Sequence, residues 1–329
     1  MLGRSSLKEW LDFMSVEVPP IHRRRIADLL DTSIRTLRSG TEDLRFQEVG
    51  VRANVVPPDL RVVLSMLTDF YTNRVYYVGP LRESPQFIYN LPPYPELTHV
   101  GLKGEFTAPV LEHFKGTQVE YPLPPELVRK SHRVDKAPLT YALRVWLEAM
   151  GLLEGVTTTD RGKMGTELAV QSAGVSRSLD LTSVGVGVSQ VLPTLVMGLI
   201  APPGTTFLLE QPELHLHPKV QAVLADFLLG LTSVGKQCIV ETHSEYLVNR
   251  LRRRVAEDES NTLSGDISLY FVEREEGRAK FRKVDVNDYG AILEWPKGFF
   301  DEGPSEAQRI MDAAMRKRRR AQSEGQGTR

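Results

Sequence analysis

Several kinds of residue are scarce in this chain, and each scarcity excludes a class of protein. Cysteine occurs once in 329 residues, at Cys238, so no disulfide can form within the chain. Scarce cysteine fits a reducing compartment, and we expect a cytoplasmic location. The formal net charge of −1 argues against a molecule that is electropositive overall and binds nucleic acid through that charge.

Long hydrophobic runs are also missing. No charged residue occurs between Asp180 and Glu210, but the apolar run within that segment, 191–201, is far shorter than the ~20 residues of a membrane-spanning helix. The first residues contain no apolar signal core. With 41% hydrophobic and 25% charged residues, the chain is expected to fold as a soluble globular protein without a membrane partner.

The spacing of apolar residues predicts how the chain is divided. Residues 1–75 are expected to be helical, and residues 76–160 to form an irregular, proline-rich connector that includes a helix near its end. Alternating strands and helices follow over 161–256. Residues 257–304 predict a β-hairpin domain, and residues 305–329 a helix with a basic tail. The predicted fold class is therefore α/β with a mainly parallel sheet.

Two short apolar strands in the core end in polar side chains. The strands are expected at 207–209 and 237–240, with a helix between them, which predicts parallel neighbours joined by a right-handed crossover. Parallel strands end at the same edge of a sheet, which is where open α/β sheets place ligands. The polar residues that follow the two strands are Glu210, Gln211, Glu241 and His243.

A glycine-rich segment precedes the first of these strands. Residues 184–188 read Val-Gly-Val-Gly-Val and lead into an apolar helix expected at 190–199. Glycine N–H groups followed by a helix N-terminus can form a cradle for anions. Mg²⁺ binds carboxylates together with phosphate oxygens and water. A glycine loop alone is weak evidence, but in front of the two polar strand ends it indicates a site for nucleotide phosphates and Mg²⁺.

In this order the segments resemble motifs of ABC-class ATPases of the OLD-like and RecF-like kind, grouped with prokaryotic AAA-type predicted ATPases. VGVGVSQVLP (184–193) resembles the signature motif, and FLLEQPELHLHP (207–218) resembles Walker B running into the D-loop. IVETHSEYLVNRL (239–251) resembles the switch-histidine segment. The segment 288–302 resembles an uncharacterised C-terminal domain of some of these ATPases, and GPLRESP (79–85) another of their segments.

The resemblance implies ATP and Mg²⁺ as cofactors and gives each matched residue a role. Glu210 would be the Walker B carboxylate that holds Mg²⁺ through water, and His243 would sense the γ-phosphate. Gln211 stands at the position of the catalytic glutamate. The D-loop would contain Glu213, His215 and His217. The signature loop, which in the family contacts ATP bound to the opposite protomer, would comprise Ser183, Gly185, Gly187, Ser189 and Gln190.

The chain departs from the family pattern at Gln211. An amide can orient water but cannot accept its proton. General-base help, typically worth ~10²–10⁴-fold, would therefore be lost or would come from Glu213 or Glu241. We expect slow ATP hydrolysis.

A second departure is the missing Walker A motif, GxxxxGK followed by Ser or Thr. The nearest match, 230–237, has Gln at the hydroxyl position and lies after a helix and before a strand, so Lys236 is interpreted as a loop lysine. ATPase activity is therefore expected only when the site is completed in a homodimer or by a partner subunit that carries Walker A.

Other functions remain open at this point. A metal-dependent hydrolase could use imidazole and carboxylate ligands from Glu213, His215, His217 and His243. The chain could also be a non-catalytic scaffold that resembles an ATPase and binds a partner. Nucleic acid is a further expected partner, through the basic run Arg316–Arg320, which would bind polyanions by counterion release.

Overall fold

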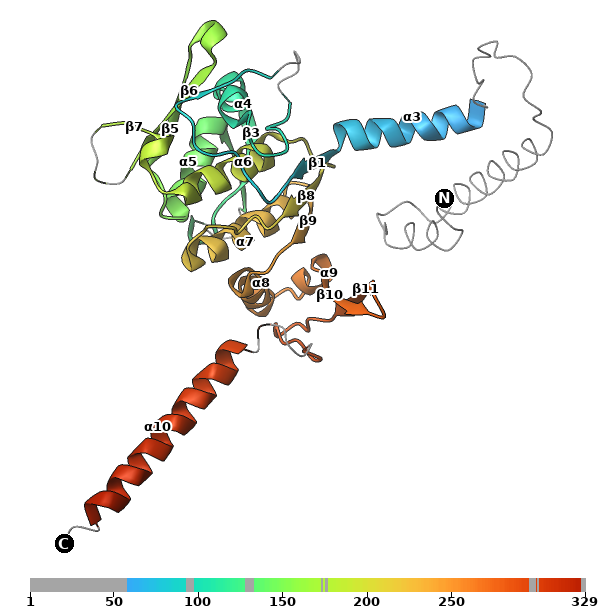
Figure 1. Cartoon of the computed structure of the whole chain (residues 1–329). Helices are drawn as coiled ribbons and strands as arrows, with labels where there is room; N and C mark the ends of the chain where they lie inside the picture. Colours follow the sequence, from blue (N-terminus) through green and yellow to red (C-terminus); the bar gives the residue numbers. More distant parts are fainter. Residues whose placement is uncertain are drawn as a thin grey trace, which may run out of the picture. The chain divides into compact units, whose positions relative to one another are not determined.

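A computed structural model describes two units of the chain, Met1–Arg74 and Val75–Arg329 (Figure 1). The described residues are 58–92, 98–127, 133–172, 174, 177–295, 300 and 302–326. Most of the helical region predicted over residues 1–75 therefore lies outside them. The first unit contributes α3 (Pro58–Asn73), which begins at a proline, as the first turn of a helix tolerates.

The second unit is organised around a parallel sheet. Its strand order is β1 (Val75–Val78), β8 (Thr206–Glu210) and β9 (Gln237–Glu241). Figure 1 shows the strands side by side, with α7 (Pro218–Thr232) connecting β8 to β9. The predicted pair of parallel neighbours is confirmed, and Glu210 lies opposite Glu241 in the register. The α/β class is also confirmed, although the other described strands pair antiparallel.

Helices cover this sheet and form the core. In α6 (Val186–Ile200) every residue from 188 to 199 is buried, as expected of a helix that is apolar on all sides. It packs beside α5 (Leu139–Ala149) and α4 (Thr107–Phe114). The ring of Trp146 in α5 meets that of Phe227 in α7 edge to face, with centroids 5.0 Å apart. Next to α7 lies α8 (Glu245–Glu257).

The described residues between 76 and 160 include several regular elements, where we expected an irregular connector with a helix near its end. The expectation weighed the prolines too heavily, because several of them occupy positions that regular elements tolerate. Pro109 lies in the first turn of α4, and Pro122 and Pro138 end the two strands of a hairpin. The elements here, besides α4 and α5, are β2 (Ile88–Tyr89), β3 (Gln118–Pro122), η1 (Pro125–Leu127), β4 (Val134–Pro138) and β5 (Gly155–Asp160).

An antiparallel sheet covers another part of the core. β6 (Thr166–Gln171) pairs with β2, β5 and β7 (Leu179–Asp180). Leu168 and Val170 point inward from β6, at the alternate positions that a half-buried strand requires. The short helical turns η2 (Gly162–Met164) and η3 (Leu181–Ser183) flank β6 and β7 in the sequence.

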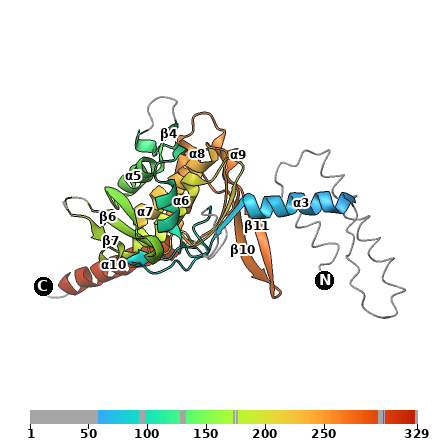
Figure 2. The same ribbon diagram turned by 90° about the horizontal axis from the view of Figure 1, so that it is seen from above.

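The C-terminal part contains the predicted hairpin and helix. α9 (Leu263–Asp266) precedes β10 (Leu269–Glu275) and β11 (Arg278–Val284), which pair antiparallel (Figure 2). Glu276 and Gly277 join them with φ angles of 50° and 81°, as a tight hairpin turn requires. α10 (Glu302–Gln326) includes the basic run. Within the part of the chain that the structure describes, no helix is both long and apolar enough to cross a bilayer.

Candidate functional site

The ends of β8 and β9 bring the predicted polar residues together. The backbone N–H of Gln211 donates to the carbonyl oxygen of Glu241 at 2.8 Å, and the Gln211 amide nitrogen lies 3.3 Å from Glu241 Oε1. Nε2 of His243 also lies 3.3 Å from Glu241 Oε1. Because the side chain of His243 is 74% exposed, this polar edge is open to a ligand.

The backbone leaves β8 in an unusual conformation. Gln211 has a φ of 43° and His215 a φ of 61°, both in the left-handed region that side chains other than glycine seldom adopt. The Gln211 backbone is held by its bond to Glu241 and by the N–H of Leu214, which donates to the Gln211 carbonyl at 3.0 Å. Such strain persists where the surrounding structure enforces it, commonly at functional sites.

Glu213 is a buried anchor rather than a surface group. Its side chain is directed at the switch-histidine segment, where Oε1 accepts the backbone N–H of His243 at 2.8 Å. The residue is 7% exposed, and its Oε2 is buried without a hydrogen-bond partner among the described residues. Of the two carboxylates considered as substitutes for a catalytic glutamate, Glu241 is therefore the better placed, because it is exposed beside Gln211.

The predicted signature loop is largely the beginning of a helix. α6 starts at Val186, so Gly187, Ser189 and Gln190 lie inside it, which corrects the expected helix start at 190. Ser189 is buried and its hydroxyl donates to the Val186 carbonyl at 2.7 Å, while Gln190 is also buried. The sequence was misleading because glycine favours loops, but the apolar residues around these glycines pack into the core.

The exposed part of this segment is the helix N-terminus itself. Ser183 and Gly185 are exposed, and Gly185 is an N-cap without a side-chain hydrogen bond. A Cβ at Gly187 would lie 3.4 Å from the carbonyl oxygen of His215, so the start of α6 packs closely on the D-loop segment. The fold thus joins two of the predicted motifs.

The histidines of the D-loop segment give no support to a metal-dependent hydrolase. Nδ1 of His217 accepts the backbone N–H of Lys219 at 3.2 Å and so caps α7. His215 is exposed on a left-handed backbone. The described ranges contain no group of three or more His, Cys, Asp or Glu residues that could hold a metal ion.

Lys236 has a structural role in its loop between α7 and β9. Its Nζ donates to the carbonyl oxygen of Gly198 at 2.7 Å and lies 3.5 Å from that of Leu199, in the last turn of α6. A cation at a helix C-terminus is favourable. Burial lowers the pKa of Lys236 to about 8. Its ammonium group is therefore engaged in the core and unlike a phosphate-binding lysine.

Sequence reasoning missed Tyr77, the partner of Glu210. The Tyr77 hydroxyl on β1 donates to Glu210 Oε1 at 3.0 Å, across 133 positions of the sequence. The GPLRESP segment that follows β1 was singled out in the sequence, whereas Tyr77 was not. What could not be seen is that this strand pairs with β8 and so places both features beside Glu210.

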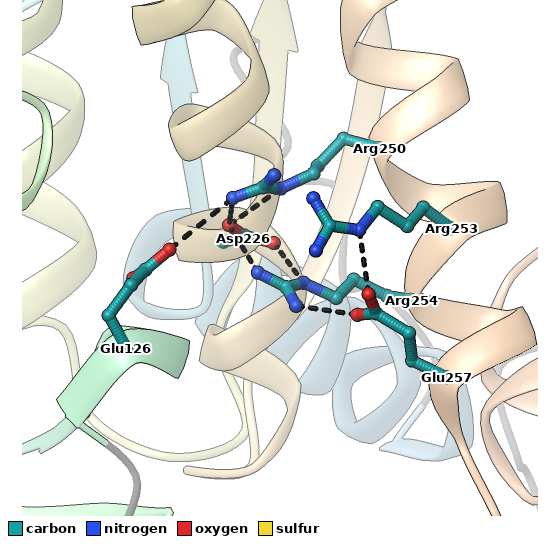
Figure 3. Close-up of polar contacts among 6 residues, drawn as sticks. All are labelled: Glu126, Asp226, Arg250, Arg253, Arg254 and Glu257. Atoms are coloured by element: carbon teal, nitrogen blue, oxygen red, sulfur yellow. Dashed lines mark hydrogen bonds and ion pairs between the residues drawn. The ribbon is translucent and has the colours of Figure 1, made fainter.

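A buried ion cluster that sequence reasoning also missed fixes α8 against α7 (Figure 3). The Asp226 side chain has no exposed surface, and Arg250 and Arg254 approach it at 2.7 Å each. Hydrogen bonding to Asp226 is the main cause that raises the pKa of Arg254. Around this centre, Arg250 lies 3.6 Å from Glu126, and Glu257 lies 2.7 Å from Arg254.

The same helix is also held at its beginning. The Ser244 hydroxyl donates to Oε1 of Gln221 in α7 at 2.6 Å and accepts the N–H of Leu247 at 3.0 Å. Because α8 begins directly after His243 and Ser244, contacts at both ends of the helix hold the switch-histidine segment in place.

Two family models match the chain. Residues 152–248 match the model described as AAA ATPase domain. Residues 264–308 match the model described as a protein of unknown function, DUF3696. The predicted resemblance to an ABC/AAA-type prokaryotic ATPase with an uncharacterised C-terminal domain is confirmed. An ATPase domain implies that nucleotide is bound.

Solved structures similar to this ATPase-like chain are SMC ATPases and Smc heads. One comes from work on ATP-driven dimerization and DNA-stimulated activation of SMC ATPases, with 13% identity, a TM-score of 0.35, and coverage of 45% of this chain and 83% of that one. The Smc head bound to the C-winged helix domain of ScpA has 12% identity, a TM-score of 0.34, and coverage of 45% and 42%. The Smc head with an extended coiled coil bound to the C-terminal domain of ScpA, derived from Pyrococcus furiosus, has 11% identity, a TM-score of 0.34, and coverage of 54% and 37%. No curated protein matches the chain.

Proposed function

We propose that this chain supplies the Walker B, D-loop, switch-histidine and signature elements of an ATP site that a Walker A-bearing lobe completes. The observation that carries the proposal is the polar edge formed by β8 and β9, where Glu210, Gln211, Glu241 and His243 converge. A carboxylate at a rigid strand end and a nearby exposed imidazole suit a metal-bound triphosphate.

The donor atoms at this edge fit Mg²⁺. Glu210 and Glu241 lie opposite each other in the register, and Gln211 adds an amide oxygen, so hard oxygen ligands gather here. In the proposed site, Glu210 holds Mg²⁺ through water and His243 contacts the γ-phosphate. Mg²⁺ would neutralise charge on the phosphate oxygens when bound. Gln211 orients the attacking water, and Glu241 is the carboxylate available to take its proton.

The N-terminus of α6 is the proposed contact to ATP held by the opposite protomer. Its first N–H groups lack a side-chain cap, and Ser183 and Gly185 are exposed there. A helix N-terminus favours anions because its N–H groups and dipole both present positive charge. Ser189 and Gln190 are buried behind this turn and would support it rather than touch nucleotide.

The outer edge of β9 supports the proposal that a further lobe completes the site. No strand among the described residues pairs with the edge of β9 that faces away from β8. Ile239 on this strand is 42% exposed, although strands of parallel sheets are normally covered on both faces. A Walker A-bearing lobe outside the printed sequence, in a dimer or from a partner subunit, would cover β9 and supply the phosphate-binding lysine.

Mg-ATP affinity tests the proposal. Equilibrium dialysis would compare the chain alone with the chain mixed with products of neighbouring reading frames. In the complete assembly, Glu210→Gln should weaken Mg-ATP binding by at least about tenfold, because the metal loses a charged partner. The control is Glu275→Gln on the exposed hairpin, which should leave affinity unchanged. If Glu210→Gln binds Mg-ATP as tightly as the wild type, the proposed site is wrong.

A non-catalytic scaffold is the second candidate. It is favoured by the structural use of Lys236 and by the amide at Gln211, since neither is suited to fast hydrolysis. Partner binding that does not change with nucleotide, in an assembly that retains no ATP, would support this candidate over the first.

Nucleic acid is proposed as a partner of α10, through Arg316–Arg320. Binding of this kind would weaken steeply as salt rises, because cations on the protein release counterions from the phosphates. Deletion of residues 316–329 should abolish a gel shift that the rest of the chain does not cause by itself.

A further inference from the structure

The segment that follows β1 is fixed by backbone hydrogen bonds. The N–H of Gly79 donates to the carbonyl of Leu102 at 2.9 Å, and the N–H of Glu83 donates to the carbonyl of Lys103 at 2.8 Å. These two anchors lie on either side of Arg82. The fold therefore fixes the backbone at Arg82 and, with it, the direction in which the side chain leaves the backbone.

Arg82 buries its charged group without a partner. Its Nε, Nη1 and Nη2 are all closed to solvent, and none has a hydrogen-bond partner among the described residues. Burial lowers its pKa to about 10, so the side chain is still protonated at neutral pH. Buried charges in proteins are almost always paired, and an arginine left with all its donors unused requires an explanation.

The groups that act electrostatically on Arg82 are Tyr77 and Glu210. The Tyr77 hydroxyl is bonded to Glu210, and its oxygen would lie 3.1 Å from a Cβ at Gly79, so the tyrosine lies against the segment that carries Arg82. Tyr77 is 36% exposed and is therefore a neighbour with room to move. Arg82 is thus within electrostatic range of the carboxylate proposed to bind Mg²⁺.

Stability does not account for a charge at this position. An apolar side chain of similar length would occupy the same space without the cost of desolvating a cation, and replacing buried ions in this way is often neutral or stabilising. A guanidinium group, in contrast, presents a planar fork of N–H donors that matches two oxygens of a phosphate. The unused donors and their place beside Glu210 indicate a ligand.

We propose that Arg82 binds a phosphate group of the nucleotide at Glu210, and that Tyr77 covers it until the ligand arrives. The inference rests on the proposed function for the identity of the ligand. A cation bound to Glu210 competes with the Tyr77 hydroxyl for the carboxylate. Metal binding therefore releases Tyr77 and opens a path to the guanidinium group. Binding of the metal at Glu210 and of the phosphate at Arg82 then both depend on the same movement of Tyr77.

Thermal unfolding of the full chain tests this with inorganic phosphate as the probe. The wild type, Arg82→Met and Arg82→Lys are compared over rising phosphate at a fixed, subsaturating concentration of MgCl2, with sodium chloride matched for ionic strength. The Tm of the wild type should rise with phosphate, since a ligand that binds the native state stabilises it. Arg82→Met should weaken the apparent affinity by at least about tenfold, without a lower Tm in the absence of phosphate. Arg82→Lys keeps the charge but loses the fork, and should show an intermediate response.

Other results would overturn the inference. A wild type whose Tm does not respond to phosphate contradicts it, as does an unchanged response in Arg82→Met. If Arg82→Met does not fold, Arg82→Lys decides. A response of Arg82→Lys to phosphate that equals that of the wild type then contradicts binding through the guanidinium fork. A lower Tm of Arg82→Met without phosphate, combined with a normal response to phosphate, would make Arg82 a structural residue.

The Arg82 test and the test of the proposed function can fail separately. The phosphate response of the chain alone reports on Arg82, whereas the effect of Glu210→Gln on Mg-ATP affinity of the assembly reports on the proposed function. The covering role of Tyr77 has its own variant, Tyr77→Phe, which removes the bond to Glu210. It should respond to phosphate at lower concentrations than the wild type, and an unchanged midpoint would contradict that role.

Discussion

Two regions of the molecule bury charge, and they do so in opposite ways. Between α7 and α8, Asp226 has no exposed surface and is bonded by Arg250 and Arg254 (Figure 3). Beside the end of β8, Arg82 is buried with none of its nitrogens bonded among the described residues. The first region has its partners within the chain and serves the fold. The second lacks them, and a missing partner at a polar sheet edge indicates a ligand.

The largest effect is expected at Asp226, the centre of the buried ion cluster. Asp226→Ala leaves two buried arginines without their shared carboxylate, and should lower the free energy of unfolding by about 3–5 kcal/mol. Urea unfolding followed by circular dichroism measures this. The matched control is Asp285→Ala, in an exposed pair with Lys283 at 3.8 Å, which should cost less than about 1 kcal/mol. Equal losses for the two variants would contradict the structural role given to the cluster.

The next largest effect is expected at the polar edge, when Gln211 is replaced by a carboxylate. Gln211→Glu supplies a carboxylate that can accept a proton from water, and should raise ATP turnover of the complete assembly by roughly 10²–10⁴-fold. Steady-state phosphate release measures the change, with Gln118→Glu at an exposed position of β3 as a control for added charge. An unchanged turnover would mean that hydrolysis is limited by another step or that Gln211 lies outside the reaction.

Lys236 is an intermediate case, a buried cation that is bonded to carbonyl groups but not to a carboxylate. Burial lowers its pKa from 10.5 to about 8, so in that interval the unfolded chain binds more protons than the folded one. Stability should therefore rise with pH between about 8 and 10.5, by up to roughly 3 kcal/mol from this residue. Lys236→Met should flatten this part of the stability profile relative to the wild type; an identical pH profile would show that burial costs the lysine little.

The smallest effect is expected at Glu213, where one oxygen is bonded and the other is not. Glu213→Ala removes the acceptor of the His243 N–H and should cost about 1–3 kcal/mol. Amide hydrogen exchange should show faster exchange at His243 in this variant. Glu213→Gln keeps a carbonyl acceptor, so His243 should remain protected in it, and loss of protection there would count against the anchor.

Much of the candidate site could be predicted because its signals are local. Apolar runs that end in Glu210 and Glu241 already indicate strands with polar ends, and the hairpin turn at Glu276 and Gly277 is marked by its residues. The start of α6 was misplaced for an equally local reason. Glycines at 185 and 187 favour a loop, but packing of the neighbouring apolar residues extends the helix through them.

The sequence by itself determined the polar ends of β8 and β9, the C-terminal hairpin and the resemblance to an ATPase. The spacing of apolar residues and the local composition are properties of short segments, so they can be recognised before the fold is known. Only the tertiary structure decided which charges meet. Tyr77 reaches Glu210 across 133 positions, and Pro109 and Pro138 proved compatible with a helix and a strand. Whether a buried charge such as Arg82 has a partner depends on contacts between segments distant in the sequence, and no local pattern contains that information.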